Sequence, residues 1–136
     1  MPEEEGTGEP IYLEFVDALG LYAAIIGGTP AQAADQLRDQ GALEGALARP
    51  RGYAAYEDAD LALQAAVLAH GIAESQAFID ANKRLALVAM LTFLELNGYR
   101  VEAPDPGLAE WILSFSSGTT PQQLAPSVRD AIRPIA

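Results

Sequence analysis

The amino-acid sequence predicts a compact all-α protein. Half of the residues are hydrophobic and alanine is abundant, a composition that favours closely packed helices over sheets. Apolar residues recur at three- and four-residue spacing in several segments, which is the mark of amphipathic helices. The 136 residues are enough for one hydrophobic core. We expect a flexible acidic tail over residues 1–10, where charge and glycine prevail, and one domain over residues 11–136.

The first part of the domain has clear helix boundaries. Residues 11–26 show the apolar spacing of a helix, since Leu13, Val16, Leu19, Tyr22 and Ile26 recur every three or four residues. Gly27-Gly28 should end this helix, and Thr29-Pro30 should start the next one as cap and first-turn proline. A break at residues 39–41 then leads to a short helix over 42–48, which Pro50 should close.

The second part alternates helices with short breaks. Asp58 is expected to cap a helix that has Leu61, Leu68 and Ile72 on one face. Residues 85–96 are apolar almost all round, which predicts a central helix covered by the others. Residues 99–103 should be extended, 104–106 a turn and 108–115 a helix. Thr120 to Gln123 has the form of a capping box that opens a last helix to about Ile132.

A short polar stretch stands between the two most apolar segments, at residues 76–84. It places Asp80, Asn82, Lys83 and Arg84 within five positions at the start of a helix. Free N–H groups and the helix dipole favour an anion there, and Arg fits phosphate oxygens with two parallel hydrogen bonds. Cations are locally unfavourable at a helix start, so a bound anion explains them better than solvent does. Asp80 suits a hard cation such as Mg²⁺, although alone it could simply cap the helix.

This stretch resembles the signature of the Fic/Doc family, and within it the death-on-curing toxins of toxin–antitoxin pairs. That signature reads His-x-Phe-x-Asp-(Gly/Ala)-Asn-Lys-Arg, and here Phe78 and the run from Asp80 to Arg84 match it. The segment from Phe93 to Gly98 matches the end of the following helix, and Arg38 to Pro50 matches an upstream family segment. The resemblance covers roughly residues 11–125. It implies a Fic/Doc-type helical domain with a small flap before the central helices.

The resemblance implies an enzyme that transfers part of a nucleotide to a protein hydroxyl. Asn82, Lys83 and Arg84 would hold the phosphates of ATP or another nucleoside triphosphate, and Asp80 would hold Mg²⁺. The Ala-Asn-Lys-Arg version implies transfer of the terminal phosphate, as a kinase does, with AMP transfer as the second choice; the target would be a protein such as a translation factor. From local chemistry alone, Asn82 could equally cap the following helix.

One departure from the signature falls on the catalytic position, because Gln76 stands where the family has His. Imidazole takes a proton near physiological pH, whereas an amide cannot. We therefore expect weak or absent activity as written. His70 is the protein's one histidine, and we expect it to pack near the end of its helix rather than to act as a substitute base. Whether Gln76 is native or engineered stays open.

Residues 51–56 look strand-like or irregular. The resemblance implies a flap there, in which Tyr53 would contribute edge hydrogen bonds to a target loop. A plain interhelix loop with Tyr53 packed on the core is an equal alternative. Phe78 is expected to plug the core and fix the polar loop.

Charge narrows the range of partners. The 8 basic and 19 acidic residues give a net charge of −11, which disfavours direct binding of nucleic acid. No apolar run is long enough to predict a membrane span, and the absence of cysteine is compatible with the cytoplasm.

Gln40 stands where the family's self-inhibitory Ser/Thr-x-x-x-Glu pattern would begin, so we expect an antitoxin protein acting in trans. The alternatives are a degenerate Fic/Doc-fold binding module, or a helical domain whose loop binds nothing.

Overall fold

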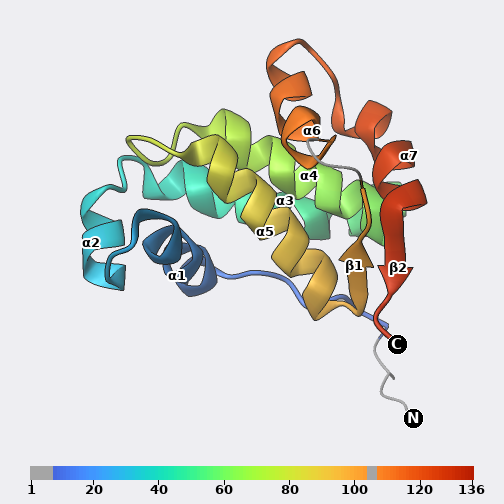
Figure 1. Cartoon of the computed structure of the whole chain (residues 1–136), viewed down its shortest axis with the longest axis horizontal. Coiled ribbons are helices and arrows are strands. Elements are labelled where there is room, and N and C mark those ends of the chain that lie inside the picture. Colours follow the sequence, from blue (N-terminus) through green and yellow to red (C-terminus); the bar gives the residue numbers. More distant parts are fainter. Residues whose placement is uncertain (1–7, 104–106) are drawn as a thin grey trace.

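The all-α prediction is confirmed. The computed structural model describes residues 8–103 and 107–136, and these residues form seven helices and one small sheet (Figure 1). Residues 1–7 of the expected tail and the whole expected turn at 104–106 lie outside the described residues. The elements in chain order are α1 (Phe15–Ile26), α2 (Pro30–Asp35), α3 (Gln40–Glu57), α4 (Leu61–Ser75), α5 (Asn82–Leu96), β1 (Tyr99–Val101), α6 (Gly107–Ser116), α7 (Pro121–Ala131) and β2 (Ile132–Pro134).

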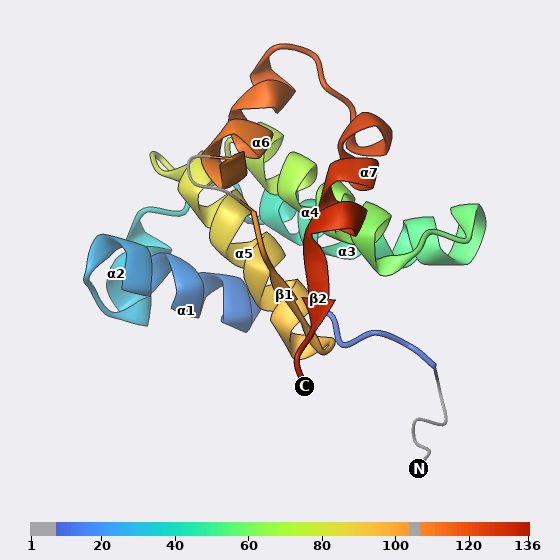
Figure 2. The same cartoon turned by 45° about the vertical axis from the view of Figure 1, so that its right-hand side comes forward.

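Helix α4 lies at the centre of the molecule, where it packs against α3, α5 and α7. Its residues are apolar on nearly every side, and Leu68 and Ile72 are almost fully buried. Helices α1 and α2 gather at one end and pack together, while α6 and α7 cover another side of the α4–α5 pair (Figures 1 and 2). The loop between α4 and α5 therefore emerges at the end where α1 and α2 lie (Figure 1).

The sheet closes the opposite end of α5. Strand β1 pairs antiparallel with β2, and Tyr99 lies opposite Pro134. The extended conformation predicted after α5 is confirmed. Strand β2 was not expected from any local signal. It follows the last helix, which ends at Ala131. Because α5 has 15 residues, this sheet lies about 22 Å from the start of that helix.

Two expectations about α3 are wrong. This helix runs from Gln40 to Glu57 without a break at Pro50, so residues 51–56 form neither a flap nor an interhelix loop. Proline removes one backbone hydrogen bond from a helix. Pro50 is nearly fully buried, however, and α3 packs along α4, so tertiary packing offsets the lost bond.

The start of α4 also differs from the expectation. Asp58 has a φ of 52° and ends α3 rather than capping α4. The cap is Asp60, whose Oδ1 accepts a hydrogen bond of 2.9 Å from the Leu63 N–H. The predicted stops and starts at Gly27, Thr29 and Thr120 are confirmed, with complete capping boxes at both threonines.

No helix among the described residues is both long enough and apolar enough to cross a membrane.

Candidate functional site

The loop of residues 76–81 joins α4 to α5, and both of its ends are in the left-handed conformation. Gln76 ends α4 with a φ of 54°, and Ala81 precedes α5 with a φ of 65°. Residues other than glycine adopt this conformation only where their surroundings enforce it. Three sets of contacts enforce it here.

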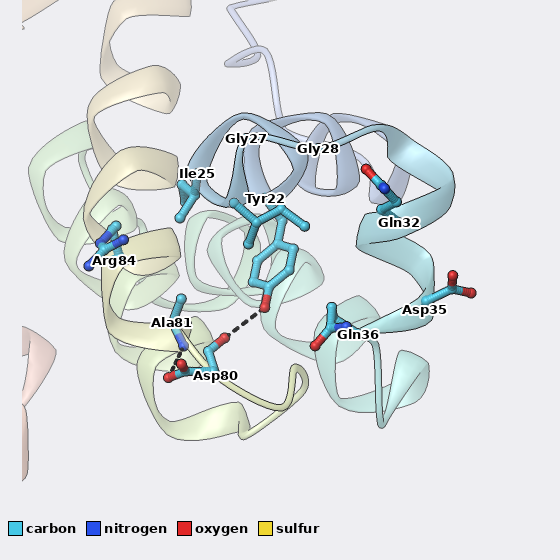
Figure 3. A pocket seen from close by; sticks show the side chains of 11 residues that line it. Tyr22, Ile25, Gly27, Gly28, Gln32, Asp35, Gln36, Asp80, Ala81 and Arg84 are labelled. Carbon is cyan, nitrogen blue, oxygen red and sulfur yellow. Dashed lines mark hydrogen bonds between the residues drawn. The ribbon is translucent and has the colours of Figure 1, made fainter.

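The first contact is an aromatic anchor. Phe78 is fully buried and its ring stacks on Tyr22 of α1, with the ring centres 3.8 Å apart and an angle of 8° between the planes. The expectation that Phe78 plugs the core is thus confirmed. The Tyr22 hydroxyl donates a hydrogen bond of 3.0 Å to the Asp80 backbone oxygen (Figure 3). Burial, and secondly the negative charge of Asp80, raise the pKa of Tyr22, so this hydroxyl stays a donor.

The second contact comes from the first residue of α5. The Asn82 side chain accepts a hydrogen bond of 3.0 Å from the Phe78 N–H and donates one of 2.9 Å to the Phe78 oxygen. Asn82 is therefore a brace for the loop and does not cap α5, which was one of the two roles expected from its local chemistry. Its side chain keeps one amide hydrogen beyond the bond to Phe78.

The third contact comes from the connection between α2 and α3. The backbone N–H groups of Arg38 and Asp39 donate to the Ala77 oxygen at 2.7 and 3.0 Å, and the Ile79 N–H donates to the Gln36 oxygen at 3.0 Å. Leu37 and Phe78 form an isolated antiparallel bridge. The segment beside the loop is thus residues 36–39, in which Leu37 forms the bridge, and not the predicted 51–56.

Two cavities flank the loop. The α1-side cavity has a volume of about 540 Å³ and lies between the loop, the end of α1 and α2, where Gln32, Asp35 and Gln36 form one wall (Figure 3). The α4-side cavity has a volume of about 270 Å³ and contains Gln76 and Lys83. Asp80 and Ala81 line both.

The predicted phosphate ligands line different sides of the loop, and Lys83 and Arg84 also line a third cavity together, of about 280 Å³, between α5 and α6. Asn82 and Lys83 line the α4-side cavity, whereas Arg84 lines the α1-side cavity. Successive helical residues point about 100° apart, so Lys83 faces the α4-side cavity and Arg84 the α1-side cavity, with the third cavity between them. Both are exposed, and neither forms an ion pair within residues 8–103 and 107–136. Together they place positive charge on two sides of one helix end.

The start of α5 differs from the starts of α2, α3, α4 and α7. Side-chain oxygens of Thr29, Asp39, Asp60 and Thr120 accept hydrogen bonds at the starts of α2, α3, α4 and α7. Ala81 offers α5 no such oxygen. The N–H groups of its first turn therefore remain available to an external acceptor. Free N–H donors, the helix dipole and two flanking cations make this end of α5 suitable for an anion.

Asp80 is the residue expected to hold a metal ion. Its Oδ1 accepts a hydrogen bond of 2.7 Å from the Ala81 N–H, and the carboxylate is exposed at the border of both cavities. No group of three or more metal-binding side chains occurs among the described residues. Mg²⁺ commonly binds to one or two carboxylates together with water and substrate phosphates, so a single exposed carboxylate is a chemically suitable ligand.

The remaining predicted residues lie as follows. Gln76 is exposed in the α4-side cavity, in the same cavity as Asp80, Asn82 and Lys83. His70 packs against Phe115 of α6, with the ring centres 5.0 Å apart and an angle of 81° between the planes, as expected, and burial lowers the pKa of His70. Tyr53 lies in α3, about 20 Å along the helix axis from Gln40 at the loop end of that helix. The structure does not bring Tyr53 to the loop.

Sequence reasoning did not assign site roles to Tyr22 and Arg38. Tyr22 was recognised only as an apolar helix position, although a buried tyrosine hydroxyl normally needs a hydrogen-bond partner. Arg38 stands in the matching upstream segment, but nothing in that segment indicates that it reaches the loop.

Comparisons with known proteins agree with this geometry. The model of the Fic/DOC family matches residues 12–94, a range that includes α1 to α4, the loop and most of α5. The chain belongs to the Fic/DOC family. It is also 36% identical over 94 residues to a protein named Toxin Doc from Mycolicibacterium smegmatis, and the match covers 68% of each chain.

Proposed function

We propose that this protein is a Doc-like toxin that uses a nucleoside triphosphate, ATP first, to modify a protein hydroxyl. The reaction proposed is transfer of the terminal phosphate, with AMP transfer as the second choice, to a target such as a translation factor. Gln76 makes the protein weakly active or inactive in its present form. The observation that carries the proposal is the uncapped start of α5 beside Asp80, Lys83 and Arg84.

Nucleotide phosphates would bind at this helix start. The N–H groups of the first turn donate to phosphate oxygens, Lys83 approaches from the α4-side cavity and Arg84 from the α1-side cavity. Phosphoryl transfer depends mainly on positioning and on stabilising negative charge. Positive groups arranged on several sides of a phosphate meet this need. Asn82 contributes chiefly by holding the loop in place.

Asp80 would hold Mg²⁺, which would neutralise phosphate charge. The carboxylate keeps one oxygen beyond its bond to the Ala81 N–H, and it borders the cavity that contains Lys83. The Tyr22 hydroxyl holds the Asp80 backbone from the core side, which orients this carboxylate outward.

The residue at position 76 would act on the attacking hydroxyl. A glutamine amide can orient this hydroxyl by a hydrogen bond but cannot accept its proton. Loss of a general base typically lowers the rate by about 10²–10⁴-fold. With Gln76 at this position, the protein would keep its phosphate site but transfer the phosphate slowly.

We expect the substitution Gln76→His to raise transfer by about 10²–10⁴-fold. Histidine tolerates a positive φ better than most residues, so the backbone at 76 should be preserved. The assay incubates each protein with [γ-³²P]ATP or [α-³²P]ATP, Mg²⁺ and either purified translation factors or a bacterial lysate. Label from the γ position alone indicates phosphate transfer, and label from the α position indicates AMP transfer.

Gln76→Asn is the matched control, because asparagine also tolerates a positive φ but has no titratable group. It should not raise labelling. Equal labelling by the unsubstituted protein and by the Gln76→His and Gln76→Asn variants would contradict the proposed role of position 76.

Nucleotide binding has its own test. Isothermal titration of ATP with Mg²⁺ should show binding that Arg84→Ala abolishes. Arg133→Ala is the control, since Arg133 is an exposed arginine on β2, at the far end of α5. Absence of binding to the unsubstituted protein would mean that the loop does not hold a nucleotide.

The second candidate is a binding module with a Fic/Doc fold and no turnover, which the non-titratable Gln76 favours. ATP binding without any gain in labelling from Gln76→His would support it.

In either case we propose that the protein acts in the cytoplasm, where nucleotides and translation factors occur. An antitoxin acting in trans would restrain the toxin, and the acidic surface suits an antitoxin with basic segments.

A further inference from the structure

The backbone at position 76 is held by Arg38, which lies 38 residues earlier in the chain. A nitrogen of the Arg38 guanidinium, Nη2, donates a hydrogen bond of 3.3 Å to the backbone oxygen of Gln76. Among the described residues, this is the one hydrogen bond that this oxygen accepts. The neighbouring Ala77 oxygen is held separately by the backbone N–H groups of Arg38 and Asp39. Arg38 thus contacts two consecutive carbonyl groups at the end of α4.

This contact also supplies a charge that α4 lacks. The last turn of α4 contains no basic residue, although its carbonyl groups carry partial negative charge. Cations stabilise such helix ends, and Arg38 provides one from the α2–α3 connection.

The left-handed conformation of Gln76 makes this contact important for its side chain. A φ of 54° is unfavourable for glutamine and persists only under outside constraint. The same φ determines where Cβ points, and in this conformation Gln76 lines the α4-side cavity with Asp80 and Lys83. If residue 76 relaxed to a negative φ, its side chain would leave that cavity.

We propose that Arg38 is a positioning residue for the side chain at position 76. It acts through the backbone carbonyl of that residue and keeps it in the left-handed conformation. This inference rests on the proposed function for its catalytic consequence, although its structural part does not.

The structural part is tested by ¹⁵N relaxation on the protein with Gln76 in place. The backbone order parameters of Gln76 and Ala77 should both be near the rigid value of about 0.85. Arg38→Ala should lower both of them below about 0.6. Arg133→Ala is the matched control, because Arg133 is also exposed and also donates to backbone oxygens, those of Asp130 and Ile132. Unchanged order parameters in Arg38→Ala would overturn the proposal.

The catalytic part is tested in the Gln76→His protein, with [γ-³²P]ATP and the labelled target. Arg38→Ala should lower kcat by about 10–100-fold with KM for ATP unchanged, because the start of α5 is untouched. Arg38→Lys keeps the positive charge and one donor, so it should recover much of kcat. A raised KM at constant kcat would overturn the proposal and make Arg38 a ligand-binding residue. If Gln76→His shows no labelling at all, the proposed function fails, and the order parameters alone decide the role of Arg38.

Discussion

Two residues of the loop adopt a conformation that their side chains disfavour. Gln76 and Ala81 have φ values of 54° and 65°, and each costs about 1–2 kcal/mol relative to the right-handed region. The buried Phe78–Tyr22 stack, the Asn82 brace and the contacts with residues 36–39 keep the loop in this shape. Strain that packing enforces in this way is typical of functional sites.

Ala81→Gly should stabilise the protein by about 0.5–1 kcal/mol. Glycine has no Cβ and adopts a positive φ without strain, which outweighs its greater freedom in the unfolded chain. The measurement is the free energy of unfolding in urea.

Ala24→Gly is the control, because Ala24 is an exposed position of α1 with ordinary helical geometry. This substitution should destabilise by about 0.5–1 kcal/mol. If both substitutions destabilise equally, the strain at Ala81 is absent.

At the scale of elements, the contact between α3 and α4 sets the position of the loop, because α4 leads directly into it. These helices approach closely at Gly71. A Cβ built on Gly71 would lie 3.2 Å from the Ala46 Cβ and 3.3 Å from the Ala46 Cα, which is tighter than an ordinary contact. Glycine therefore allows the two backbones to lie this near each other.

Gly71→Ala should destabilise the protein by up to about 2 kcal/mol, because the added methyl group meets the Ala46 backbone, and this overpacking, which costs about 1–3 kcal/mol, exceeds the gain of about 1 kcal/mol in helix propensity. Thermal unfolding followed by circular dichroism measures the effect.

Gly20→Ala is the matched substitution in α1, where a Cβ would meet nothing within 4 Å. It should stabilise by about 0.5–1 kcal/mol through helix propensity alone. Stabilisation by both substitutions would show that α3 and α4 move apart without cost.

At the scale of the whole molecule, an ion pair joins the middle of the chain to its C-terminal part. The Arg129 guanidinium of α7 donates two hydrogen bonds to the Asp60 carboxylate, at 2.7 and 3.2 Å, while Asp60 caps α4. The hydrogen bond from Arg129, together with that from the Leu63 N–H, holds the pKa of Asp60 below its ordinary value despite partial burial. About half of each side chain is exposed, so solvent weakens the pair.

This lowered pKa makes part of the stability depend on pH. A carboxyl group with a lower pKa in the folded state stabilises the protein above the unfolded pKa, which is about 3.9 for Asp. The contribution disappears as the pH falls through the folded pKa. We therefore expect Asp60→Asn, which keeps the cap, to cost up to about 1 kcal/mol at pH 6 and progressively less below about pH 4.

Urea unfolding at a series of pH values measures this difference. Asp35→Asn is the control, because Asp35 is exposed and has no ion pair among the described residues. A pH-independent difference for Asp60→Asn would contradict the role of the ion pair.

Local signals in the sequence determined the helical class and most helix boundaries. Thr29 and Thr120 cap helices because their hydroxyls reach N–H groups three residues away, and Gly27 ends α1 because it adopts a positive φ. Such short-range rules failed at Pro50 and Asp58. There the packing of α3 along α4 outweighs the local preference to break the helix, and Asp60 becomes the cap instead.

In the candidate site, too, local sequence signals determined some features and tertiary packing determined others. Asp80, Asn82, Lys83 and Arg84 are consecutive or nearly so, and the sequence alone indicated their common place at a helix start. Only the tertiary structure decided that Tyr22 and Arg38 hold this loop, from 58 and 38 residues away. It also decided that Tyr53 lies far from it. Periodicity and capping depend on neighbours within one or two helical turns, whereas contacts between distant segments form only when the helices pack around α4.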